Sequence, residues 1–124
     1  MNLNQVTLPA LDIPASVAFY RKLGFTQIVD TPHYARFECP KGESTFSLHK
    51  VDRTVPDSGV VVYFETDRLD ALVEELQQNG VDFTQEPRDE RWLWREARLR
   101  DPAGNVICLY WAGPYRKYPP WRIG

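Results

Sequence analysis

The architecture follows from residues 13–27, which read IPASVAFYRKLGFTQ. Val17, Tyr20 and Leu23 recur at helical spacing and would form one apolar stripe. Gly24 comes next, and glycine commonly ends a helix because it tolerates the left-handed backbone conformation. This stretch therefore predicts a short amphipathic helix that ends at Gly24 and leads into a strand.

The same pattern recurs 56 residues later in the chain. Gln5 precedes Val61 by 56 positions, and Gly24 precedes Gly80 by the same number. A second helix, from about Arg68 to the glycine, has its own apolar stripe, formed by Leu69, Leu72, Val73 and Leu76. Self-similarity at a fixed period indicates that one structural unit occurs twice.

Short apolar or alternating runs separated by turn signals predict the strands. They occupy residues 3–8, 26–30, 34–39 and 45–50 in the first half, and residues 60–65, 83–85, 92–99 and 106–111 in the second. The order strand, helix and three strands therefore occurs twice, which places the fold in the α+β class. We expect one domain over residues 1–113, with module one at 1–51, a linker at 52–59 that includes Pro56, module two at 60–113, and an extended tail at 114–124.

Three motifs occur in a characteristic order: residues 13–20 running into 23–25, residues 63–67 leading into 69–71, and the turn at 101–105. Together they resemble the vicinal-oxygen-chelate superfamily, the glyoxalase, bleomycin resistance protein and extradiol dioxygenase group. The resemblance implies two βαβββ modules that form a cupped mixed sheet around a cavity, usually completed by dimerisation. In enzymatic members it also implies a divalent metal held by His, Gln or Glu side chains.

The metal-ligand positions that this resemblance implies fall on Gln5, Val61 and Cys108. Valine has no donor atom, and a thiolate does not replace a carboxylate that binds magnesium, manganese or ferrous iron. We therefore expect no resident metal and no other cofactor. One alternative is a zinc site formed by Gln5, His49 and Cys108, which would combine oxygen, nitrogen and sulfur donors.

Strand alternation predicts the side chains that would line the cavity. They are Gln5, Thr7, Ser47, His49, Val61, Tyr63, Trp92, Trp94, Glu96, Arg98, Cys108 and Tyr110. A shift of one residue in the strand at 92–99 would instead turn Arg95 inward. Broad aromatic faces with a few polar groups are typical of a pocket for a partly aromatic small molecule, in which Arg98 or Arg95 would hold an acidic group. The alternative is that the tryptophans pack a dimer core and that Glu96 and Arg98 form an ordinary ion pair.

Cys108 is also a candidate nucleophile, with His49 as the base that would lower the pKa of its thiol. The opposing interpretation is that Cys108 is a small buried apolar residue. Cys39 and Cys108 lack the spacing of a zinc or redox pair, so we expect both to be free thiols.

Composition and charge exclude other classes of function. The formal net charge of −2 gives no field that would attract nucleic acid. No stretch approaches the roughly 20 apolar residues of a membrane span. The first residues lack the features of a secretory signal, so we expect a cytoplasmic protein.

The leading hypothesis is a metal-independent small-molecule-binding protein of the glyoxalase and bleomycin-resistance type, acting as a homodimer. Its ligand is expected to be partly aromatic and to carry an acidic group. The alternative is an enzyme of the same superfamily, a lyase, isomerase or dioxygenase, that uses a rearranged metal site or metal-free acid-base chemistry. Fold alone does not decide between these classes.

Overall fold

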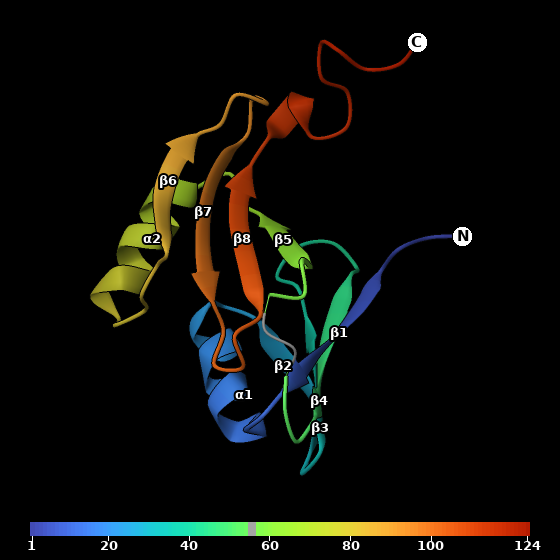
Figure 1. Cartoon of the computed structure of the whole chain (residues 1–124), viewed down its shortest axis with the longest axis vertical. Coiled ribbons are helices and arrows are strands. Elements are labelled where there is room, and N and C mark those ends of the chain that lie inside the picture. Colours follow the sequence, from blue (N-terminus) through green and yellow to red (C-terminus); the bar gives the residue numbers. More distant parts are fainter. Residues whose placement is uncertain (55–56) are drawn as a thin grey trace. The chain divides into compact units, whose positions relative to one another are not determined.

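The computed structural model describes residues 1–54 and 57–124, and the chain divides into two compact units (Figure 1). The first comprises Met1–Gly59 and Asp101–Asn105, and the second comprises Val60–Arg100 and Val106–Gly124. Within the described residues, each unit contains one four-stranded mixed sheet and one α-helix. The predicted βαβββ order is thus confirmed in both. Pro56, which the sequence places in the linker, lies outside the described residues.

The first unit has its sheet strands in the order β1-β4-β3-β2. Its elements are β1 (Gln5–Ala10), α1 (Ile13–Lys22), β2 (Thr26–Thr31), β3 (Tyr34–Glu38) and β4 (Thr45–Lys50). β1 pairs with β4 in parallel, whereas β3 is antiparallel to both β4 and β2. Because β1 is an edge strand, it accommodates Pro9, which has no N–H to donate to a neighbour. The predicted strand therefore continues through Pro9 to Ala10.

Local chemistry explains where α1 begins and ends. The Asp12 carboxylate accepts a hydrogen bond from the backbone N–H of Ala15 at 3.0 Å, which satisfies one of the free donors of the first turn. Pro14 lies in that turn, where its missing N–H costs no helical bond. Gly24 has a φ of +104°, which favours glycine and ends the helical course of the chain. The helix predicted from Pro14 to Gly24 is therefore confirmed.

The core of the first unit lies between α1 and one face of its sheet. Tyr20 of α1 is fully buried, and its ring centroid lies 4.9 Å from that of Phe46 and 5.8 Å from that of Phe37. Phe37 and Phe46 are stacked on each other at 5.0 Å. These aromatic contacts add to the stabilisation that comes from burying the apolar area itself.

The turn at Asp101–Asn105 belongs to this first unit, although it connects two strands of the second. The buried Asp101 carboxylate accepts hydrogen bonds from the Tyr20 hydroxyl at 2.6 Å and from the Asn105 side-chain amide at 2.8 Å. It also accepts bonds from the backbone N–H groups of Ala103 and Asn105. The Asn105 amide donates in turn to the carbonyl of Pro9 at 3.0 Å. The turn is therefore fixed by a fully bonded carboxylate.

The second unit repeats the arrangement, with its strands in the order β5-β8-β7-β6. Its elements are β5 (Val61–Glu65), α2 (Leu69–Gln78), β6 (Gln85–Asp89), β7 (Arg95–Arg100), β8 (Val106–Trp111) and a 3₁₀ turn, η1 (Gly113–Tyr115). α2 buries Leu69, Val73 and Leu76, three members of the stripe that the sequence predicts. None of the helices in the described parts of the chain is long and apolar enough to cross a membrane.

Two of the strands predicted in the second unit have different bounds in the structure. The strand predicted at 83–85 begins at Gln85 and continues to Asp89, and the strand predicted at 92–99 begins only at Arg95. The pairing of Asp89 with Arg95 leaves residues 90–94 as the connecting turn, in which Leu93 has a φ of +69°. Trp92 and Trp94 have high strand propensity, but the geometry of an antiparallel connection overrides it. The tail is also less extended than predicted, because it opens with η1.

Candidate functional site

The pairing of β7 with β8 determines which side chains of the second sheet share a face. Glu96 lies opposite Tyr110, and Arg98 lies opposite Cys108. Cys108 in turn lies opposite Tyr63 of β5, so these residues occupy the sheet face that α2 leaves uncovered. Arg95 occupies the other face, where its Nε lies 2.9 Å from a carboxylate oxygen of Asp70 in α2. The alternative register, with Arg95 inward, is therefore wrong.

Three rings on the uncovered face form what we call the aromatic cluster: Tyr63, Trp94 and Tyr110. The Trp94 centroid lies 4.8 Å from that of Tyr110 and 5.8 Å from that of Tyr63, and the two tyrosine centroids are 5.3 Å apart. Tyr110 is buried, whereas Tyr63 is 41% exposed. The cluster therefore has an accessible ring, that of Tyr63, and a buried ring, that of Tyr110.

A buried ion pair borders the aromatic cluster. The Glu96 side chain is only 1% exposed, and it accepts hydrogen bonds from Trp92 Nε1 at 2.7 Å and from Arg98 Nη2 at 3.1 Å. Arg98 Nη2 also donates to the hydroxyl of Tyr63 at 3.3 Å, which ties the ion pair to the cluster. Trp92 thus reaches the site from the turn through its indole N–H, a role that strand alternation did not predict.

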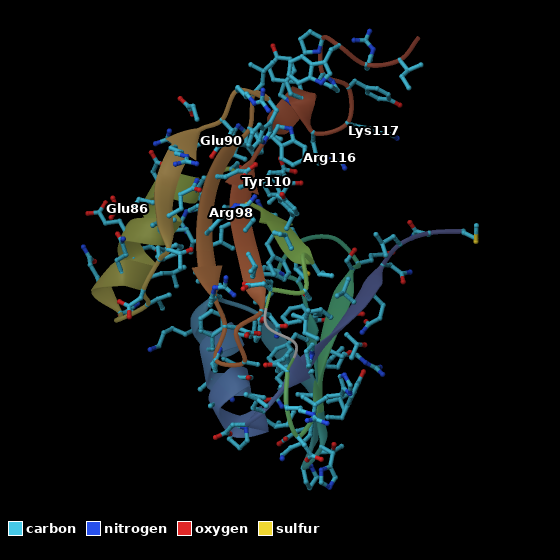
Figure 2. All side chains as sticks on the ribbon, in the orientation of Figure 1. Glu86, Glu90, Arg98, Tyr110, Arg116 and Lys117 are labelled. Carbon is cyan, nitrogen blue, oxygen red and sulfur yellow. The ribbon has the colours of Figure 1, made fainter. Side chains whose placement is uncertain are left out.

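The carboxylate of Glu90 lies on the same side of the sheet as this ion pair. Glu90 accepts hydrogen bonds from Arg88 at 2.8 Å and from Gln85 at 3.2 Å. Arg88 lowers the pKa of Glu90, with smaller contributions in the same direction from Gln85 and Arg98. Figure 2 labels Glu90, Arg98 and Tyr110 on this part of the second unit. The positive charge of Arg98 is therefore balanced by acidic neighbours.

Cys108 has the environment of a structural residue. Its side chain is fully buried, and burial raises the pKa of the thiol to about 12, with a further contribution from the nearby Glu96. A thiol with such a pKa is protonated at neutral pH, whereas nucleophilic catalysis requires the thiolate. The geometry therefore favours Cys108 as a small apolar residue of the sheet.

This environment makes stability depend on pH in a testable way. Because the folded state holds the Cys108 proton above the ordinary pKa of 9.0 and the unfolded state releases it, stability is complete below pH 9 and falls as pH rises toward 12. In a Cys39→Ser background, we expect the free energy of unfolding to fall by on the order of 1 kcal/mol between pH 8 and 10. Urea unfolding should show that adding Cys108→Ala removes this loss. An equal loss in both proteins would contradict the assignment.

The tail is anchored to the second unit at two points. The carboxylate of Glu65 accepts hydrogen bonds from the backbone N–H groups of Ala112 and Gly113 at 3.0 and 3.1 Å. Trp94 Nε1 donates to the carbonyl of Tyr115 at 2.9 Å. Glu65 and Tyr115 were not predicted as site residues, since nothing in the local sequence indicates that the chain turns back after β8.

The predicted residues of the first unit share the sheet face that α1 leaves uncovered. The strand register places Thr7 opposite Ser47 and Gln5 opposite Thr45. Gln5 donates to Ser47 at 2.5 Å and accepts a hydrogen bond from Thr45. The hydroxyl of Tyr34, which was not predicted, lies 2.6 Å from Ser47 Oγ and accepts a hydrogen bond from Arg36 Nε at 3.0 Å. This face is a hydrogen-bonded polar network.

A hollow in the first unit lies elsewhere. It has a volume of about 490 Å³, and its walls are Arg21 and residues 24–30 beside the edge strand β2. None of the predicted cavity residues lines it. It is open to solvent and has no cluster of chemically reactive side chains, so the aromatic cluster is the better candidate for a site.

Comparison with known proteins identifies the family. Residues 2–109 match the model of the glyoxalase/bleomycin resistance protein/dioxygenase superfamily, and the chain belongs to this superfamily. No curated protein matches the chain. A glyoxalase/bleomycin resistance protein/dioxygenase from Nocardioides is 26% identical, with a TM-score of 0.77 over 100% of this chain and 90% of that one.

Two further solved structures share the fold. A bleomycin-binding protein complexed with bleomycin is 20% identical, with a TM-score of 0.73 over 90% of this chain and 98% of that one. A lactoylglutathione lyase from Agrobacterium tumefaciens is 18% identical, with a TM-score of 0.76 over 94% and 97% of the two chains. The glyoxalase and bleomycin-resistance fold expected from the sequence is therefore confirmed.

The residues at the metal positions implied by the superfamily do not fit a divalent metal. Val61 has no donor atom, and Cys108 presents a thiol where the superfamily implies a carboxylate. The side-chain oxygen of Gln5 already accepts a hydrogen bond from Thr45. Across residues 1–54 and 57–124, no three His, Cys, Asp or Glu side chains form a group that could hold a metal.

Proposed function

We propose that this protein binds a planar, partly aromatic small molecule without a metal, on the aromatic cluster of its second unit. The main support for this proposal is that Tyr63, Trp94 and Tyr110 pack together and form an accessible aromatic surface on the uncovered sheet face. Pockets for such ligands combine aromatic walls with a few fixed polar groups. Here the polar groups are Glu96 and Arg98, next to the rings.

The cluster is arranged for binding before any ligand arrives. Trp94 is held through its indole N–H by the carbonyl of Tyr115, and Tyr63 is held through its hydroxyl by Arg98. A ring that is already fixed loses little conformational entropy when a ligand stacks on it. Aromatic pairs of this kind contribute about 0.5–1.5 kcal/mol beyond the area they bury. The proposal therefore assigns most of the affinity to ring contacts.

Replacing one ring of the cluster tests this assignment. We expect Trp94→Leu to weaken binding of 2-naphthoate about tenfold, because the substitution removes a stacking surface. Isothermal titration calorimetry measures the dissociation constant directly. Trp121→Leu is the matched control, since Trp121 is an exposed tail tryptophan outside the cluster. Equal affinity in the wild type and in Trp94→Leu, or absence of binding to the wild type, would reject the proposal.

The proposal includes a homodimer located in the cytoplasm, as expected from the sequence and from the superfamily. Each unit exposes large apolar side chains, such as Ile28 in the first and Trp111 in the second, and association with a second copy would bury apolar surface of this kind. Light scattering during gel filtration should give roughly twice the chain mass of 14.4 kDa. A mass of one chain would remove the dimer from the proposal.

A further inference from the structure

The tail carries positively charged side chains and no acidic ones. Residues 112–124 include Arg116, Lys117 and Arg122 and no Asp or Glu. No ion pair is described for these three cations within residues 1–54 and 57–124. Lys117 lies over the ring of Tyr118 at 5.4 Å, and Arg122 donates to the carbonyl of Pro119. Arg116 has neither kind of contact.

The fold brings Arg116 back toward the aromatic cluster. Arg116 follows η1, whose start is held by Glu65 and whose last residue, Tyr115, accepts the hydrogen bond from Trp94. In the view of Figure 2, Tyr110 lies between Arg98 and Arg116. Burial raises the pKa of Tyr110, Glu65 adds to the rise, and the charge of Arg116 opposes it, which agrees with this proximity.

The two arginines beside the cluster differ in their charge balance. Arg98 is paired with the buried Glu96 at 3.1 Å, so an incoming anion would compete with an existing carboxylate. Arg116 is exposed and has no described acidic partner in the same range of residues. A guanidinium without a partner is the better site for a carboxylate or phosphate group.

We propose that Arg116 determines the specificity of the site, by binding the acidic group of a planar aromatic anion whose ring stacks on the accessible rings of Tyr63 and Trp94. This inference rests on the proposed function and assigns to Arg116 the role that strand alternation predicted for Arg98 or Arg95. The ligand class is an aromatic carboxylate or an aromatic phosphate, because both present the oxygen geometry that a guanidinium binds. The tail is then part of the binding site.

The test compares 2-naphthoate with its neutral amide, 2-naphthamide, by isothermal titration calorimetry of the full chain. We expect the wild type to bind the acid about tenfold more tightly than the amide, the usual magnitude for a charge-assisted hydrogen bond. Arg116→Gln should bring this ratio close to one, and Arg116→Lys should restore part of it. Arg122→Gln removes the same charge from the same tail and should keep the wild-type ratio.

Each contrary outcome has a separate meaning. Equal binding of acid and amide to the wild type would overturn the role of Arg116 while leaving the proposed function intact. An unchanged ratio in Arg116→Gln, or an equal loss in Arg122→Gln, would also overturn it, since the preference would then come from another residue or from the general charge of the tail. Failure of both compounds to bind would overturn the proposed function together with this inference. Phenyl phosphate, titrated in parallel, distinguishes a phosphate site from a carboxylate site.

Discussion

Asp101→Ala is expected to lower the free energy of unfolding by about 3–5 kcal/mol, the usual cost of removing one member of a buried, charged hydrogen-bond network. The Asp101 carboxylate accepts bonds from the Tyr20 hydroxyl, from the Asn105 side chain and from two backbone N–H groups. Without it, the hydroxyl of the fully buried Tyr20 has no acceptor. Urea denaturation followed by circular dichroism measures the change.

An exposed aspartate provides the matched control. The Asp89 side chain is 85% exposed, although it also contacts an arginine, Arg95, at 3.0 Å. Since exposed ion pairs contribute little, Asp89→Ala should cost less than about 1 kcal/mol. If the two substitutions cost the same, the turn at Asp101–Asn105 is not the fixed element that its hydrogen bonds indicate.

Arg98→Met is expected to destabilise the protein by about 3–5 kcal/mol, because it leaves a buried carboxylate without its counter-charge. The Glu96 side chain is 1% exposed, and the partners that would remain, the indole N–H of Trp92 and the thiol of Cys108, carry no positive charge. The change in the free energy of unfolding comes from urea denaturation at neutral pH.

A double variant tests whether the loss in Arg98→Met comes from the unpaired Glu96 carboxylate. Replacing both partners, as in Arg98→Met with Glu96→Leu, removes the unpaired charge and should recover most of the stability that Arg98→Met loses. The cycle formed by the two single variants and the double variant then gives a coupling energy of about 2 kcal/mol or more. Additive losses would mean that Glu96 and Arg98 act independently.

The repeated architecture could be predicted from the sequence because its signals are local and occur twice. The apolar stripe before Gly24 and its counterpart before Gly80 mark both helices, and Gln5 and Val61 mark the corresponding first strands. The strands β4 and β8 begin and end as predicted. The period of the apolar residues and the turn residues are sufficient to predict such elements.

The candidate site could be predicted only in part. Alternation placed Tyr63, Glu96 and Arg98 on one face with Tyr110, because β-strand geometry fixes which side chains share a face. It assigned Trp92 to the strand, whereas the indole reaches Glu96 from a turn whose position depends on how β6 pairs with β7.

The contacts that anchor the tail could not be predicted. They are hydrogen bonds between residues far apart in the sequence, from the backbone N–H groups of Ala112 and Gly113 to Glu65 and from the indole of Trp94 to the carbonyl of Tyr115. Such contacts leave no periodic signal in the chain. Composition alone had indicated an extended segment rich in proline.

The central claim is that this site binds a planar aromatic ligand without a metal. The most direct test is calorimetric titration of 2-naphthoate into protein dialysed against a chelator, repeated after adding zinc, manganese or ferrous iron. The proposal predicts the same dissociation constant, within about twofold, under all of these conditions. Binding that appears only after a metal is added, and that is lost in His49→Ala, would contradict it.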